Sequence, residues 1–138
     1  MENLNVVLQQ LEQGCSCAAY DGVTMLRSQQ RGVAPLLQWL NEGVCLEAFC
    51  VADKVVGRGA AFLYVLLHAK MLHARVISTP ALELLKSMDI AVTYDICVPA
   101  IRNRDNTGFC PIEAAVLDCT DPQSALLKIK AKLKELQK

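Results

Sequence analysis

The chain lacks an excess of charge of either sign, and aromatic and histidine residues are scarce. Among its 138 residues, 14 are Lys or Arg, 14 are Asp or Glu and 2 are His, which gives a formal net charge of zero. Proteins that bind nucleic acid usually carry a basic excess, so its absence argues against such a partner. The longest apolar run, near residues 59–67, is too short to cross a bilayer. No basic and then apolar leader opens the chain. We therefore expect a soluble cytoplasmic protein with no membrane partner.

The grouped ligands of a zinc site and the pairs of a disulfide framework are also missing. The seven cysteines are Cys15, Cys17, Cys45, Cys50, Cys97, Cys110 and Cys119. An odd number in a chain without an export signal argues against a disulfide framework. Cys15 and Cys17 are too close together for the usual zinc knuckle, and His68 and His73 are not four residues apart. We expect no metal and no other cofactor, and most of these cysteines should be buried as small apolar side chains.

Apolar residues are abundant, at 53% of the chain, and charged residues make up 20%. This composition excludes a disordered chain. The length suits a single domain over residues 1–138, large enough to bury a sizeable core.

The apolar pattern predicts alternating helices and strands. A first helix should end near Gly14, and strands at 15–20 and 23–27 flank Asp21-Gly22, which is a strong hairpin signal. The later predicted elements are a helix at 33–40, a strand at 45–52, a helix at 54–68 capped by Asp53, a strand at 72–77, a helix capped by Ser78 or Thr79, a strand within 90–101, a helix from Cys110 or Pro111 to about 117, and a last helix from Asp121-Pro122.

A hairpin followed by strand–helix repeats predicts a three-layer α/β/α fold with a mixed sheet. The later strands should be parallel, because helices connect them. In such sheets ligands bind beyond the carboxyl ends of the strands. We therefore expect three turns to line one crevice: Asp53-Lys54, Ser78-Thr79 and the segment 102–113.

The segment 102–113 has the densest functional chemistry of the chain. It contains the guanidiniums of Arg102 and Arg104, the amide of Asn103, the thiol of Cys110 and the carboxylate of Glu113. The free N–H groups at a helix start, together with nearby arginines, favour a thiolate. We predict that Cys110 and Glu113 are the catalytic candidates and that Cys110 is the most reactive cysteine. Two alternatives stay open: Cys110 is an ordinary helix-start residue, and Glu113 caps the backbone.

A second candidate site lies at the predicted helix 54–68. Lys54 and Arg58 are four residues apart, and Gly57 and Gly59 leave the first turns open to a ligand or to a neighbouring strand. Cations beside a helix N-terminus form an anion site, and close helix–sheet packing at the glycines is the alternative. The predicted ligand-binding residues are Asp53, Lys54, Gly57, Ser78, Arg102, Asn103 and Arg104.

Several of these turns together resemble one family. The residues that carry the likeness are 51–57 (VADKVVG), 76–78 (VIS), Asn103-Arg104 and 110–113 (CPIE). In order and wording they resemble an uncharacterised prokaryotic family with a cytidine deaminase-like fold but no deaminase zinc motifs, over roughly residues 15–135. The resemblance implies a single cytidine deaminase-like domain and no established activity.

The resemblance also allows a comparison with true deaminases. Those enzymes hold zinc with a His or Cys beside a catalytic Glu at one helix start and a Pro-Cys-x-x-Cys at the next. Here Pro80 is kept, but Ala81 and Leu84 stand where the thiolates would be needed, and no His lies near Asp53 before His68. Zinc hydrolysis needs three protein ligands, so we do not expect base deamination.

Two function classes stay open. In the first, the protein binds a small anionic or nucleotide-like ligand and acts on it through Cys110. In the second, it is a non-catalytic protein-interaction module that kept the fold. A solvent-reachable cleft joining Cys110, Asn103 and Arg104 to Asp53 or Lys54 would favour the first. A homodimer is the assembly we expect.

Overall fold

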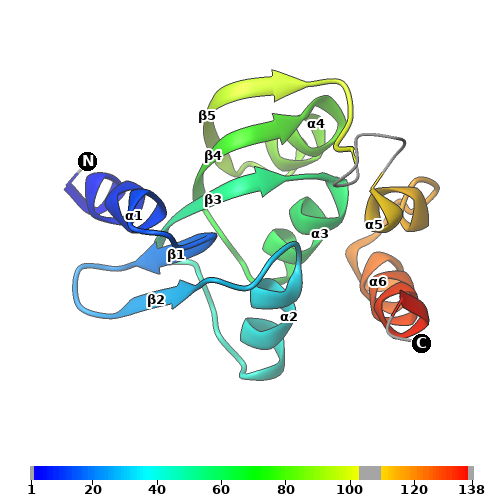
Figure 1. Cartoon of the computed structure of the whole chain (residues 1–138), viewed down its shortest axis with the longest axis horizontal. Helices are drawn as coiled ribbons and strands as arrows, with labels where there is room; N and C mark the ends of the chain where they lie inside the picture. Colours follow the sequence, from blue (N-terminus) through cyan, green and yellow to red (C-terminus); the bar gives the residue numbers. More distant parts are fainter. Residues whose placement is uncertain (1, 103–109, 137–138) are drawn as a thin grey trace.

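The computed structural model describes residues 2–102 and 110–136 (Figure 1). The helices are α1 (Glu2–Glu12), α2 (Ala34–Asn41), α3 (Arg58–Leu66), α4 (Thr79–Ser87), α5 (Pro111–Ala115) and α6 (Pro122–Leu136). The strands are β1 (Cys17–Tyr20), β2 (Met25–Ser28), β3 (Cys50–Val56), β4 (Met71–Ser78) and β5 (Ala91–Val98).

The five strands form one mixed sheet in the order β2-β1-β3-β4-β5. β1 is antiparallel to both β2 and β3, whereas β3, β4 and β5 are parallel. The predicted α/β fold, with its mixed sheet and N-terminal hairpin, is therefore confirmed. The hairpin turn is held by Asp21, whose Oδ1 accepts hydrogen bonds from the N–H groups of Val23 (2.8 Å) and Thr24 (2.6 Å).

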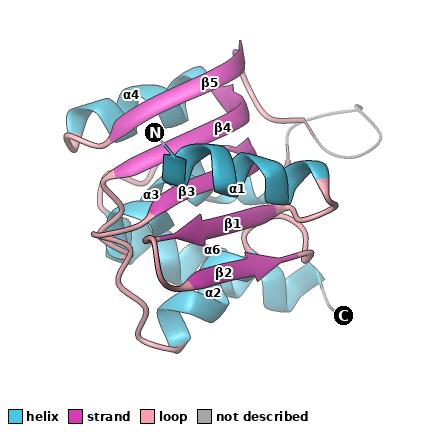
Figure 2. Cartoon of the chain, turned by 90° about the vertical axis from the view of Figure 1, so that its left-hand side faces the viewer, coloured by secondary structure: helices cyan, strands magenta, loops and turns pink. Residues whose placement is uncertain are grey.

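Helices lie on both faces of the sheet. α1 alone lies in front of the sheet in Figure 2, and its Val7 and Leu11 pack on Ala18 of β1 and Ala52 of β3. The larger core lies on the opposite face, where side chains from α2, α3, α4 and α6 cover the sheet. α3 is central to that core, and its residues 59–64 are all buried. A helix that is apolar on every side, as α3 is, belongs in the interior.

The bounds of β3 correct one prediction. The sequence pattern predicted a strand at 45–52 with Asp53 as a helix cap, but β3 runs from Cys50 to Val56, so Asp53 lies within the strand. Val55 and Val56 are β-branched, and they extend the pairing by lying opposite Val76 and Ile77 of β4. Pairing with β4 therefore outweighs the capping preference of Asp53.

The start of α3 changes as a consequence. Gly57 is its N-cap residue and Arg58 its first residue, so Lys54 lies on the strand and cannot share a helix face with Arg58. The prediction of a shared face was wrong. The start of α4 agrees with the prediction, because Ser78 is the N-cap residue and its Oγ accepts a hydrogen bond from the Ala81 N–H at 3.2 Å.

Within the described ranges, no helix is both long enough and apolar enough to cross a membrane.

Candidate functional site

A pocket of about 310 Å³ opens at the carboxyl end of β3, and we call it the β3 pocket. Its described lining residues are Ser16, Arg31, Gly32, Val33, Asp53, Lys54, Val55, Gly57, Ala60, Ile101, Cys110, Ile112 and Glu113. They come from the residue before β1, the loop before α2, the end of β3, the first turn of α3, the segment after β5 and the start of α5. Ligands of parallel sheets bind at this edge, so the location is the one the fold favours.

Five of the predicted site residues line this pocket: Asp53, Lys54, Gly57, Cys110 and Glu113. The outcome for the other four is different. Ser78 is fully buried, and its hydroxyl caps α4. Arg102 is exposed and is not among the described lining residues. Asn103 and Arg104 lie outside the described residues.

The buried wall of the pocket contains a hydrogen-bonded trio of side chains. Asp53 is only 5% exposed, and its Oδ2 accepts a hydrogen bond from the hydroxyl of Tyr64, on α3, at 2.6 Å. Cys17 lies opposite Asp53 on β1, and its Sγ is 3.3 Å from the same hydroxyl. The N–H of Val55 is 3.4 Å from the other carboxylate oxygen, Oδ1.

Burial raises the pKa of all three groups. Removal from water raises the pKa of Asp53 to about 7, although the hydrogen bonds from Tyr64 and from the backbone oppose the shift. Burial also raises the pKa of Cys17 and of Tyr64 well above their usual values, and the neighbouring Asp53 carboxylate adds to both shifts. The trio therefore holds two neutral groups beside one carboxyl that changes charge near neutral pH.

Glu113 closes the N-terminus of α3 from a distant part of the chain. Its Oε1 accepts the N–H of Arg58 at 2.7 Å, and its Oε2 accepts the N–H of Gly59 at 2.9 Å. These N–H groups begin a helix and have no partner within it, and a carboxylate also suits the positive end of the helix dipole. The sequence predicted an anion site at the start of this helix. In the structure the carboxylate of Glu113, from the same chain, binds there.

Arg58 of α3 in turn contacts the backbone beyond α5. Its guanidinium donates to the carbonyl oxygens of Val116 at 2.8 Å and Leu117 at 3.0 Å, just beyond α5, and lies 4.9 Å from the ring centroid of Phe62. Each helix therefore contributes a side chain that hydrogen-bonds the backbone at an end of the other. Glu113 of α5 caps the N-terminus of α3, and Arg58 of α3 binds carbonyl oxygens at the C-terminal end of α5.

Gly57 leaves room for the Glu113 carboxylate. A Cβ atom at residue 57 would lie 2.5 Å from the Glu113 Cδ, which is closer than real Cβ contacts come, so the carboxylate would have to move and would lose its hydrogen bonds to α3. The backbone of Gly57 (φ −97°) is open to any residue, so the cost of a side chain here comes from displacing Glu113.

Cys110 lies at the mouth of the pocket as the N-cap residue of α5, and its side chain is half-buried. Its N–H donates to the carbonyl oxygen of Ile101 at 3.1 Å. Ile101 and Ile112 line the same pocket as Cys110 and are both apolar.

Three residues of the candidate site were not predicted from the sequence. Arg31 is exposed at the rim, after Gln29-Gln30, where only the glycine that follows it marks a turn. Tyr64 and Cys17 look like ordinary core residues in the sequence. A polar hydroxyl inside an otherwise apolar helix was the available signal for Tyr64, because such a group needs a buried partner.

Among residues 2–102 and 110–136, no group of three His, Cys, Asp or Glu side chains lies close enough together to hold a metal ion.

The comparisons with known proteins agree with one another. The family model described as TM1506, a domain of unknown function (DUF1893), matches residues 6–133. The crystal structure of a DUF1893 family protein from Thermotoga maritima is similar over 97% of this chain and 90% of that chain, with 31% sequence identity and a TM-score of 0.84. No curated protein matches the chain. The chain belongs to the DUF1893 family, whose function is unknown.

Proposed function

We propose that the β3 pocket binds a small ligand in which an anionic group is joined to a largely apolar heterocyclic body, as in a nucleotide. The main support is that one mostly apolar pocket contains cations, a buried titratable carboxyl and a thiol. Pockets of this kind, with an apolar lining and a few polar groups, are typical of small-molecule sites.

The positions of the charged residues suit one part of the pocket to the anionic group of the ligand and another part to its apolar body. Lys54 and Arg31 are exposed at the rim, where they can bind an anionic group without losing much hydration. Val33, Val55 and Ala60 offer an apolar surface to the body of the ligand. Asp53, with its pKa of about 7, can exchange a proton with a ligand at neutral pH, and strongly shifted groups in clefts mark functional sites.

We assign Cys110 as the candidate nucleophile of this pocket, since its thiol is half-buried there. Glu113 was also predicted to be catalytic. Both of its oxygens accept hydrogen bonds from α3, and this supports a positioning role for Glu113, holding α5 and Cys110 against the pocket.

The proposal includes a cytidine deaminase-like fold. Support comes from the mixed five-stranded sheet with an N-terminal hairpin and helices on both faces. The two helix starts that would hold zinc in a deaminase carry Gly57-Arg58-Gly59 and Ser78 to Leu84, and neither supplies a His or Cys. The ligand class is thus inferred from the pocket, and hydrolytic deamination is not part of the proposal.

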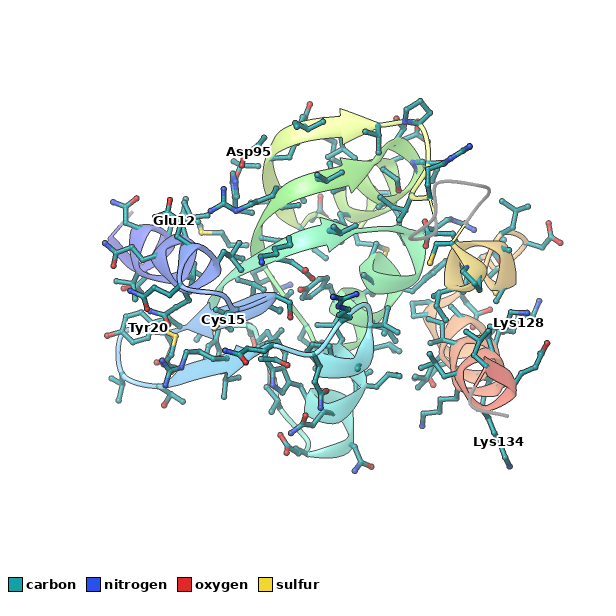
Figure 3. The ribbon with its side chains drawn as sticks, viewed as in Figure 1. Glu12, Cys15, Tyr20, Asp95, Lys128 and Lys134 are labelled. Atoms are coloured by element: carbon teal, nitrogen blue, oxygen red, sulfur yellow. The ribbon has the colours of Figure 1, made fainter. Side chains whose placement is uncertain are left out.

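Titration calorimetry with nucleoside 5′-monophosphates, sugar phosphates and inorganic phosphate tests ligand binding. We expect at least one organic phosphate to bind, and Lys54→Ala or Arg31→Ala to weaken it about tenfold, or roughly 1.4 kcal/mol. Lys134→Ala is the matched control, because Lys134 is an exposed residue of α6 (Figure 3) and is not among the described lining residues of the pocket. If none of these ligands binds, or if all three variants weaken binding equally, the pocket has no anion specificity and the interaction-module alternative is favoured.

Alkylation with iodoacetamide tests Cys110. The structure changes the expected competitors, because Cys15, Cys17 and Cys119 are buried, whereas Cys45 and Cys97 are exposed. We predict that Cys110 is labelled fastest and that a saturating phosphate ligand slows only this site. Mass mapping with Cys45 and Cys97 as internal controls gives the answer. Equal slowing at all three sites, or unchanged labelling of Cys110, would place the ligand elsewhere.

A further inference from the structure

The two edges of the sheet differ in how well they are protected. β2, at one edge, has only four residues, including Arg27. β5, at the other edge, has eight residues with the sequence AVTYDICV, and Asp95 is its only charged residue. Natural edge strands avoid unwanted pairing through short length, lysine, proline or bulges. β5 is long and has no lysine or proline, and among the described residues no strand pairs with its outer edge (Figure 2).

We propose that β5 is a homodimer interface, in which the β5 strands of two copies pair antiparallel across a two-fold axis and join the sheets. Most residues of β5 are exposed, which is unusual for a strand so rich in β-branched and apolar side chains. Tyr94 is 42% exposed and Ile96 is 56% exposed. A second copy is the occupant that fits, because the strand complements itself.

The complementarity centres on Tyr94. In a two-fold antiparallel pair, residues directly opposite each other point to the same face of the sheet. If Tyr94 of one copy lies opposite Tyr94 of the other, Val92 meets Ile96, Thr93 meets Asp95 and Ala91 meets Cys97. Each pairing is matched in character, and the aromatic pair at the centre is a favourable cross-strand contact.

The faces of β5 agree with this register. Tyr94 and Ile96 are register partners of Ala74 and Val76, so they lie on the face that α2, α3, α4 and α6 cover and would extend the larger core across the dimer. In this register residues 91–97 of the two copies overlap, because Val98 falls opposite Ile90, which precedes β5. This seven-residue antiparallel overlap supplies about six to eight backbone hydrogen bonds to groups that otherwise face water.

The single charge of β5 is already compensated within the chain. Asp95 Oδ1 is 3.1 Å from His73 Nε2, and its Oδ2 is 3.8 Å from Arg75 Nη1. Arg75 also lies 3.9 Å from Glu12 of α1, and Figure 3 shows Asp95 and Glu12 on this α1 side of the sheet. The register keeps the two Asp95 carboxylates from facing each other directly, because each faces a threonine hydroxyl instead.

Sedimentation equilibrium of the full chain tests the interface. We expect the wild type to have twice the mass of the chain, and Ile96→Lys to raise the dimer Kd by at least about tenfold, since a lysine is then placed opposite Val92 of the partner. Val23→Lys is the control, because Val23 is 90% exposed in the hairpin turn and receives the same charge change. A wild type that stays monomeric at every concentration, or an Ile96→Lys dimer of unchanged Kd, would overturn the proposal.

Hydrogen exchange gives a readout that survives poor folding of the variant. In wild-type protein, the amides of residues 91–98 should exchange more slowly as concentration rises, while those of β2 should not change. A dimer whose β5 exchange does not depend on concentration uses another surface and equally contradicts the inference.

Discussion

The free energy of unfolding should fall as the pH rises from about 4 to about 7, and Asp53 should cause the fall. The pKa of this carboxyl is about 7 in the folded protein against an ordinary value of 3.8. Between these two values the folded chain binds a proton that the unfolded chain has lost, so stability decreases with rising pH and levels off above about 7. At about 1.4 kcal/mol per pH unit, a shift of about three units gives a loss of up to about 4 kcal/mol.

The variant Asp53→Asn isolates this effect. Its amide keeps an oxygen that can accept the hydrogen bond of Tyr64, but it cannot become charged. Urea unfolding should find the variant close to the wild type near pH 4.5 and more stable by up to about 4 kcal/mol near pH 8. Asp118→Asn changes an exposed carboxylate and should leave the pH dependence intact. A stability difference that is the same at both pH values would show that Asp53 is already ionised at the lower pH.

The pH dependence also bears on function. A buried carboxyl that is ionised at physiological pH lowers stability, and such destabilising groups are concentrated at functional sites. If Asp53→Asn is more stable but no longer binds the ligand, this one variant would show that Asp53 lowers stability and serves ligand binding. Stabilisation without any effect on binding would leave Asp53 as a structural partner of Tyr64.

Replacing Glu113 should lower stability by about 3–6 kcal/mol. Glu113→Ala removes two hydrogen bonds to a charged group, each worth about 1.5–3 kcal/mol, from the start of a buried helix. Gly57→Ala should lower stability by a similar amount, because the new methyl group must displace the Glu113 carboxylate while the backbone stays unstrained. Denaturant unfolding of Glu83→Ala, which removes an exposed glutamate of α4, provides the control.

The double variant gives the sharper test. Once Glu113 is alanine, a Cβ atom at residue 57 no longer meets its carboxylate. We therefore expect Gly57→Ala to have little further effect in that background, so that the two single losses do not add. Full additivity would mean that the two residues act separately and that Gly57→Ala destabilises the protein for a reason other than its contact with Glu113.

The sequence by itself determined the order of elements and the edge of the sheet where the site should lie. Asp21-Gly22 set the hairpin, and Ser78 with Pro80 set the start of α4, because turns and caps depend on neighbouring residues. Helices between the later strands required parallel pairing, so the turns after the strands had to gather at one edge. The sequence therefore predicted Asp53, Lys54 and Cys110 at this edge, and all three line the β3 pocket.

The tertiary structure alone decided what these residues do. β3 continues through Asp53 because β4 pairs with the residues beyond it, and no local pattern contains that partner. Removal from water raises the pKa of Asp53 to about 7, although the hydrogen bond from Tyr64 acts in the opposite direction. Glu113 caps a helix 55 residues earlier in the chain. A cap within one turn can be read from adjacent residues, whereas contacts across such separations arise only when the chain packs.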